Sequence, residues 1–132
     1  MKFILRGLPA LWLLMSLSWS AHATDPCAHT GNTIETGECM SQQFAALDRE
    51  LNRAYQELLK RIDAEDPKYV DRSTVRRRLV EAQRSWIEFR KQDCEGQYKL
   101  FEGGTIRSLR FQGCMIEHTQ KRITDLKNWD RV

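Results

Sequence analysis

The stretch "AQRSWIEFRKQDCEG" at residues 82–96 combines helical spacing with an unusual set of side chains. Gln83, Trp86, Arg90 and Cys94 recur at intervals of three, four and four residues, so a helix places them on one stripe. A helix that only buried an apolar face would not set an amide, a guanidinium and a thiol beside its tryptophan. Such a stripe serves a catalytic site, a metal, a partner or the fold itself.

Residues 1–23 have the features of a secretory signal peptide. Two basic residues precede the apolar run "LPALWLLMSLSW", and the small residues Ala21 and Ala23 favour cleavage after Ala23. An apolar run of about 12 residues is too short to cross a bilayer, and no cysteine directly follows the cleavage position to carry a lipid. We expect the mature chain, residues 24–132, to be periplasmic or secreted and not inserted in the membrane.

The mature chain has the length of one compact domain and an almost neutral charge. Removing Lys2 and Arg6 leaves 19 basic residues against 18 acidic ones. Balanced charge offers no extended positive field for phosphate groups. The basic run at residues 76–78 is typical of a solvated helix face. We therefore expect no nucleic-acid partner.

All four cysteines of the chain lie in its mature part: Cys27, Cys39, Cys94 and Cys114. An even number of cysteines in an oxidising compartment predicts two disulfides, each worth roughly 2–4 kcal/mol. A metal site is the alternative, because Cys114 and His118 stand four residues apart and Cys27 lies near His29. The paired C-x-x-C spacing of structural zinc sites is absent, however. We expect no metal and no cofactor.

Three segments repeat apolar residues every three or four positions, as amphipathic helices do. The first begins between Thr33 and Cys39 and ends before Asp66-Pro67. The second follows this break, with Ser73 as one candidate N-cap and Phe89 in its apolar stripe, and ends between Gly96 and Tyr98. The third follows the Gly103-Gly104 turn, where Thr105 can cap it. The pattern predicts an all-α fold, an antiparallel three-helix bundle whose N-terminal segment is stapled by Cys27.

The two turns determine which cysteines come close together. If the chain folds back at residues 66 and 67, Cys39 comes beside Cys94; if it folds back at residues 103 and 104, Cys94 comes beside Cys114. Three cysteines then lie at one end of the bundle, and Cys27 is tethered near Cys39. Two pairings fit: Cys27–Cys39 with Cys94–Cys114, which we prefer because both closures are short, or Cys39–Cys94 with Cys27–Cys114.

The same register brings polar and aromatic side chains from all three helices toward a common seam: Asp48, Asn52, Gln83, Trp86, Arg90, Thr119 and Arg122. A buried arginine needs a carboxylate and further acceptors. We expect Asp48 to neutralise one guanidinium, and the amide and hydroxyl groups to complete the hydrogen bonds. This structural role is favoured over a cleft that exposes part of the seam to a ligand.

The motifs of common enzymes are absent from the chain. It has no Ser-His-Asp order and no glycine-rich phosphate loop, and its mature part holds two histidines. We expect no catalytic residues, and we interpret His118 as a surface or seam residue rather than a general base.

Three stretches resemble the LprI-like lysozyme-inhibitor domain family of exported bacterial proteins. They are "CMSQQFAALDRELNRAYQELL" at 39–59, "AQRSWIEFRKQDC" at 82–94 and "FEGGTIRSLRFQGCMIEHTQKRITDL" at 101–126. The resemblance covers residues 27 to about 127. The family usually has Asp after the arginine and Ser after the glycine pair, where this chain has Lys91 and Thr105. Its founding member is a lipoprotein, whereas this chain lacks the lipid-bearing cysteine.

The resemblance implies a protein-binding module that inhibits lysozyme by occluding its glycan cleft, with lysozyme or another envelope protein as the partner. The alternative is a structural or stress-related envelope protein that binds no lysozyme. Because vertebrate lysozymes are basic, an inhibitor is expected to present acidic groups. The candidates lie near the predicted cysteine end: Glu35, Glu38, Glu95 and Glu102. The sequence leaves the oligomeric state open.

Overall fold

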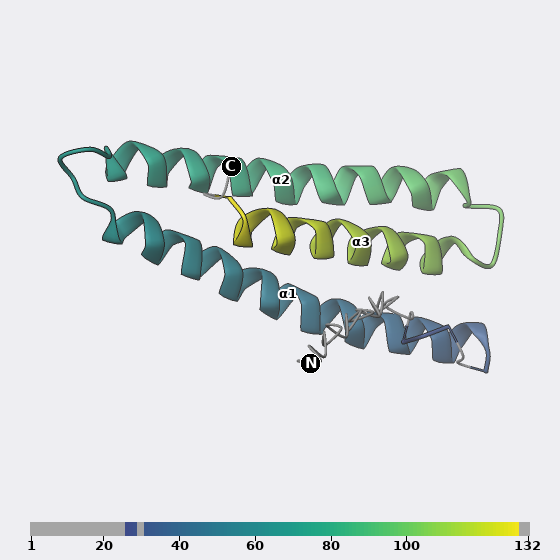
Figure 1. The fold of residues 1–132 in the computed structure, drawn as a ribbon. Coiled ribbons are helices and arrows are strands. Elements are labelled where there is room, and N and C mark those ends of the chain that lie inside the picture. The colour runs from purple at the N-terminus through teal and green to yellow at the C-terminus, as the bar shows by residue number, and fades with distance from the viewer. Residues whose placement is uncertain (1–25, 29–30, 130–132) are drawn as a thin grey trace, which may run out of the picture.

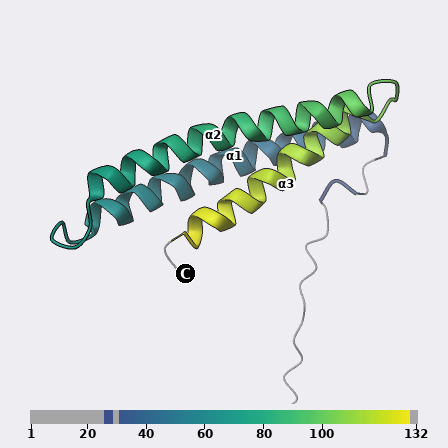
Figure 2. The ribbon, with the colours of Figure 1, turned by 90° about the horizontal axis from the view of Figure 1, so that it is seen from above.

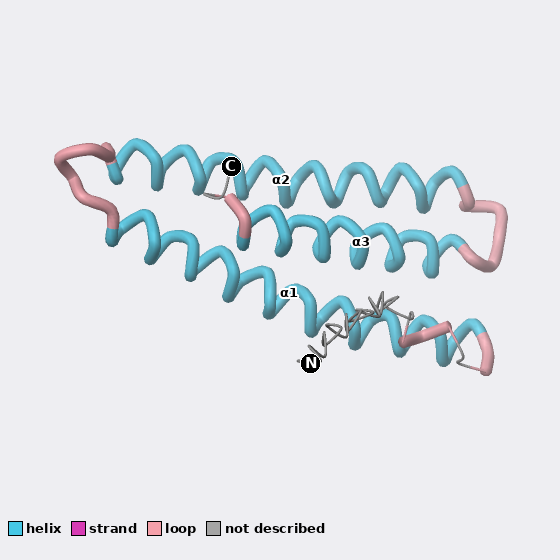
Figure 3. The backbone as a smooth tube through the Cα atoms, viewed as in Figure 1, coloured by secondary structure: helices cyan, strands magenta, loops and turns pink. Residues whose placement is uncertain are grey.

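The computed structural model describes residues 26–28 and 31–129, which form three helices: α1 Thr33–Ala64, α2 Arg72–Leu100 and α3 Arg107–Lys127. Helices α1 and α3 run in the same direction and α2 runs against both (Figure 1). The turns at 65–71 and 101–106 lie at opposite ends of the bundle (Figure 3). The predicted antiparallel three-helix bundle is confirmed. The predicted signal peptide, residues 1–23, lies outside the described residues and stays a prediction.

Helix α1 begins within the predicted window because Asn32 caps it. The Asn32 side chain accepts hydrogen bonds from the backbone N–H groups of Ile34 and Glu35, at 2.9 and 3.0 Å. The Glu35 carboxylate in turn accepts from the Gly31 N–H at 3.0 Å. These bonds satisfy donors that the first helical turn would otherwise leave unpaired.

Helix α2 is capped by Asp71, not by Ser73 as one prediction had it. Asp71 accepts from the Thr74 N–H at 3.1 Å and from the Ser73 hydroxyl at 2.7 Å. These bonds to the charged form, that of Ser73 first, lower the pKa of Asp71 to about 2. The helix also runs past its predicted end, to Leu100.

Helix α3 starts without the cap that the sequence suggested. Its N-cap position is Ile106, which offers no side-chain hydrogen bond, so the prediction of Thr105 as the cap was wrong. The preceding turn is closed in another way. The Gly104 N–H donates to the Phe101 carbonyl at 2.9 Å, and the Arg107 guanidinium donates to the Glu102 carbonyl at 2.8 Å.

The hydrophobic core draws most of its side chains from α1, with others from α2 and α3: Leu51, Ala54, Leu58, Leu59, Ile62, Leu79, Ile123 and Leu126. Helix α1 packs more extensively on α3 than on α2. Fully burying one leucine or isoleucine stabilises a fold by roughly 1.5–3 kcal/mol, so this cluster is the main source of packing energy. Phe89, predicted to belong to the apolar stripe, is instead 54% exposed.

The register between α2 and α3 follows the prediction, and that between α1 and α2 does not. Asp48 faces Arg90 and Asp63 faces Arg76, which shifts α1 by about five residues from the expected pairing. The turn occupies residues 65–71 instead of closing tightly at 66 and 67. Cys39 consequently does not come beside Cys94.

Helix α3 is the shortest of the three, and α1 and α2 continue beyond its C-terminal end to the turn at 65–71 (Figures 1 and 2). None of the helices in the described part of the chain is long and apolar enough to cross a membrane.

Candidate functional site

Both disulfides lie near the end of the bundle that carries the 101–106 turn, and we call this region, residues 26–28, 31–44 and 94–115, the cysteine-rich end. Cys27 bonds to Cys39 with a Cα–Cα distance of 5.8 Å, and Cys94 bonds to Cys114 at 5.6 Å. Both distances are ordinary for disulfides. The preferred pairing and the stapled N-terminal segment are therefore confirmed, and the alternative pairing through Cys39–Cys94 is wrong.

The buried side of the seam centres on Arg90, which is 7% exposed. Its Nη1 donates to Thr119 Oγ1 at 2.8 Å and lies 3.6 Å from Asp48 Oδ1. Its guanidinium lies 4.8 Å from the ring centre of Trp86 and 5.4 Å from that of Phe44. Burial lowers the pKa of Arg90, and the charge of Asp48 opposes that shift. Arg90 thus ties α2 to both other helices.

The guanidinium of Arg122 also lies against the Trp86 ring. Arg122 Nε donates to the Gln83 side-chain oxygen at 3.0 Å, and its guanidinium lies 5.7 Å from the Trp86 ring centre. Burial also lowers the pKa of Arg122, against the opposing charge of Asp125. Asn52, which the sequence placed in this seam, is exposed. The side chains that meet here join the three helices through Arg90 and Arg122.

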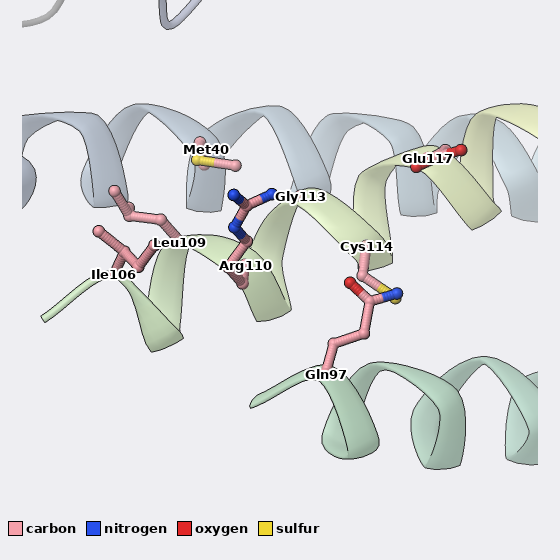
Figure 4. A pocket seen from close by; sticks show the side chains of 8 residues that line it. All are labelled: Met40, Gln97, Ile106, Leu109, Arg110, Gly113, Cys114 and Glu117. Carbon is pink, nitrogen blue, oxygen red and sulfur yellow. The ribbon is translucent and has the colours of Figure 1, made fainter. Parts of the chain in front are cut away.

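Two shallow hollows flank α3 at the cysteine-rich end. The larger, of about 490 Å³, lies where Met40 of α1 and Gln97 of α2 approach the α3 side chains (Figure 4). The rest of its lining is Ile106, which precedes α3, and five α3 residues: Leu109, Arg110, Gly113, Cys114 and Glu117. The other, of about 350 Å³, has an aromatic lining that includes Phe44, Tyr98 and Phe111.

The four glutamates proposed as partner contacts stand in different surroundings. Glu35 is engaged with the Gly31 N–H at the start of α1, and Glu38 is exposed. Glu95 lies 3.9 Å from Lys91 and Glu102 lies 2.8 Å from Lys99. The Lys99 hydrogen bond lowers the pKa of Glu102. Lysines beside two of the four glutamates reduce the acidic field of this end.

Three of the exposed large apolar side chains also lie at this end. Ile34 is 74% exposed, Leu100 is 78% exposed and Ile106 is 42% exposed. They lie at the start of α1, the end of α2 and the turn before α3. Ile34 and Leu100 carried a signal in the sequence, because both are apolar residues at helix ends outside the predicted apolar stripes.

A further polar pair escaped the sequence analysis. Nε2 of His118 lies 2.8 Å from the Asp93 carboxylate, and the Phe89 ring meets the His118 ring edge-on at 5.4 Å between centres. Asp93 precedes one cysteine of a disulfide, and His118 follows the other by one helical turn. The register of that disulfide could have predicted their contact.

The fold defines a small helical protein stapled by two disulfides near one end of its bundle. The chain belongs to the LprI lysozyme-inhibitor family, because the family model described as "Lysozyme inhibitor LprI" matches residues 23–126. The chain is also similar to an uncharacterized protein of Rhizobium meliloti (strain 1021), with 31% identity over 126 residues that cover 90% of this chain and 91% of the relative. No solved structure matches it. The family described is one of inhibitors and not of enzymes.

Proposed function

We propose that this protein is an exported binding module that inhibits a lysozyme by inserting its cysteine-rich end into the glycan cleft. Cleavage after Ala23 would release it into the periplasm or the medium. Family membership supports lysozyme as the partner, and inhibition follows from occlusion, with no chemical step.

The observation that carries this proposal is that exposed apolar side chains lie at the end of the bundle held by both disulfides. Leu100 precedes the 101–106 turn and Ile106 ends it, and the two helices that this turn connects are joined by Cys94–Cys114. Ile34 stands in the segment joined by Cys27–Cys39. A few well-packed residues near the centre of an interface carry most of its binding energy. A surface that is already rigid loses less conformational entropy on binding than a mobile loop does.

The four glutamates have a secondary role in this proposal. Glu38 is exposed, while Glu95 and Glu102 face lysines of their own helix or turn. These charges would set the orientation and association rate on a basic enzyme, and the apolar groups would set the strength. The local neutralisation also favours the second candidate, an envelope protein that binds no lysozyme.

An activity assay separates these two candidates. Oxidised mature protein is added at micromolar concentration to several lysozyme types, and cell-wall lysis is followed by turbidity. We expect loss of activity for at least one type. Unchanged lysis by every type would support the second candidate.

A matched pair of variants tests which end makes the contact. Leu100→Gln should weaken inhibition at least tenfold, as expected for loss of a central apolar contact worth about 1.4 kcal/mol or more. Tyr69→Gln is the control, since Tyr69 is 75% exposed at the opposite turn, and should leave inhibition unchanged. If Tyr69→Gln weakened inhibition and Leu100→Gln did not, the contact surface would lie at the opposite turn, residues 65–71.

A further inference from the structure

Four side chains that commonly bind metals meet where α2 and α3 are joined. Asp93 and Cys94 come from α2, and Cys114 and His118 come from α3. Their ligand atoms all lie within 4.8 Å of one another. Asp93 Oδ2 lies 2.8 Å from His118 Nε2 and 3.8 Å from Cys114 Sγ. In the oxidised protein the two sulfurs bond to each other. Reduction of this one disulfide would free both sulfurs and give four possible metal ligands.

We propose that the protein binds one Zn²⁺ ion at Asp93, Cys94, Cys114 and His118 when the Cys94–Cys114 disulfide is reduced. Two thiolates, one imidazole and one carboxylate are ligands that zinc accepts in tetrahedral sites. The site is redox-dependent, because disulfide sulfurs do not provide the thiolates that bind the metal.

The four side chains are already grouped closely enough to reach one metal ion. Tetrahedral zinc with bonds of about 2.3 Å to sulfur and 2.0–2.2 Å to nitrogen or oxygen sets neighbouring ligand atoms about 3.4–3.8 Å apart. The present separation of Cys114 Sγ from the carboxylate, 3.8 Å, agrees with this range. The imidazole and carboxylate, at 2.8 Å, need to move apart by about half an ångström. The two sulfurs, 2.00 Å apart in the disulfide, must separate to about 3.8 Å around the metal. This is the largest shift, and we expect rotation of the two cysteine side chains to supply it, since their Cα atoms stand 5.6 Å apart.

The surroundings also suit a bound cation. Cys94 is wholly buried and Cys114 is 6% exposed, so the thiolates would stand at the helix interface. The side chains of His118 and Asp93 are 25% and 42% exposed, which gives the ion a path from solvent. Phe89 packs edge-on against the imidazole and restrains its ring.

The redox step is balanced by a dithiol reductant. The dithiol gives two electrons and two protons to the disulfide, producing two cysteine thiols, and closes its own disulfide. When Zn²⁺ binds, the two thiols release their protons to solvent and become thiolate ligands. The metal then connects α2 to α3 in place of the broken bond. Zinc would therefore provide a crosslink between the two helices in a chain whose disulfide is reduced.

Direct metal binding tests the proposal in the Cys27→Ser/Cys39→Ser variant of the mature chain, which keeps a single cysteine pair. The protein is reduced with a dithiol, freed of reductant without oxygen, and titrated with Zn²⁺ against a coloured chelator. We expect one ion per chain in the reduced form and no comparable binding in the oxidised form. Co²⁺ in place of Zn²⁺ should give the intense visible bands of a tetrahedral site with thiolate-to-metal charge transfer.

Ligand variants and a stability measurement complete the test. His118→Asn and Asp93→Asn should each weaken Zn²⁺ binding by about tenfold or more. Glu117→Gln, beside His118 and not among the ligands, should leave it unchanged. Because a variant can lose its fold on reduction, the thermal midpoint of the reduced protein is also measured with and without Zn²⁺, and should rise with the metal. Equal Zn²⁺ affinity in the oxidised protein, or full affinity and the same Co²⁺ spectrum in His118→Asn, would overturn the proposal, as would a reduced protein that binds no zinc.

Discussion

Removing the Arg90 side chain is the most direct test of the seam. Arg90→Ala deletes the hydrogen bond to Thr119, and a hydrogen bond from a charged donor is worth about 1.5–3 kcal/mol. It also deletes the contacts with the rings of Trp86 and Phe44, each about 0.5–1 kcal/mol. Removing a buried guanidinium from its apolar surroundings relieves a desolvation cost and offsets part of this loss.

The rest of the expected loss in unfolding free energy depends on Asp48, whose carboxylate loses its partner in Arg90→Ala. The Asp48 side chain is 42% exposed, so water can solvate it once its partner is gone. Its pairing with Arg90 therefore adds at most about 1 kcal/mol, as for other partly exposed ion pairs. We expect Arg90→Ala to reduce the free energy of unfolding by roughly 2–3 kcal/mol, below the 3–5 kcal/mol typical of fully buried pairs.

Urea denaturation followed by circular dichroism measures this change, and the thermal midpoint should fall by on the order of 10 °C for a domain of this size. Arg84→Ala is the matched control, since Arg84 is exposed on the same helix, and should stay within about 0.5 kcal/mol of the parent protein. An Arg90→Ala protein with an unchanged midpoint would refute the structural role of the seam and would favour a binding role for the guanidinium.

Three further outcomes are expected. Mass spectrometry of the mature protein should show four hydrogens fewer than the free-thiol form, whereas cysteines reactive without reductant would contradict the two disulfides. The Cys27→Ser/Cys39→Ser variant should unfold with a free energy lower by about 3 kcal/mol in urea titration, because the crosslink no longer restricts the unfolded chain. Since hydrogen bonds lower the folded-state pKa of Asp71 to about 2 from 3.8, its contribution to stability is present above the higher value and is lost as pH falls through the lower. Thermal midpoints across this pH window should fall less steeply in Asp71→Ala, and an identical slope would count against the cap.

The sequence predicted the helices and one of their two registers for physical reasons. Apolar spacing identifies helices reliably when they are long, and α1 and α2 are both long. The turn after α2 is short, so the sequence predicted that Cys94 would lie beside Cys114 and that Arg90 and Thr119 would share one seam, as they do.

The register of α1 could not be predicted in the same way. Asp66-Pro67 indicated a break but not the length of the turn, which extends over residues 65–71. The position of α1 is set by packing on α3, its non-sequential neighbour, and this packing leaves no local trace in the sequence. The expected contact of Cys39 with Cys94 failed for this reason.

Details of exposure and capping were the least predictable. Phe89 fits an apolar stripe by spacing, yet α3 is placed so that the ring stays 54% exposed beside His118. Thr105 is a suitable N-cap by residue type. The first backbone hydrogen bond of α3, however, is accepted by the Ile106 carbonyl, so the helix begins at Arg107. Both outcomes depend on how the elements are placed, which residue type alone does not determine.

The placement of the two disulfides determines which parts of the unfolded oxidised chain are already held close together before folding. One closes a loop within the N-terminal segment and the start of α1, and the other joins α2 to α3 across the adjacent turn. Neither crosses from α1 to another helix. In the oxidised chain α2 and α3 therefore begin folding already tethered, and the remaining long-range step is docking of α1 onto them. Docking brings α1 beside α3 and closes the loop of chain between them, at a cost in conformational entropy that neither crosslink reduces. The rate of folding should therefore depend chiefly on how fast α1 docks on α3.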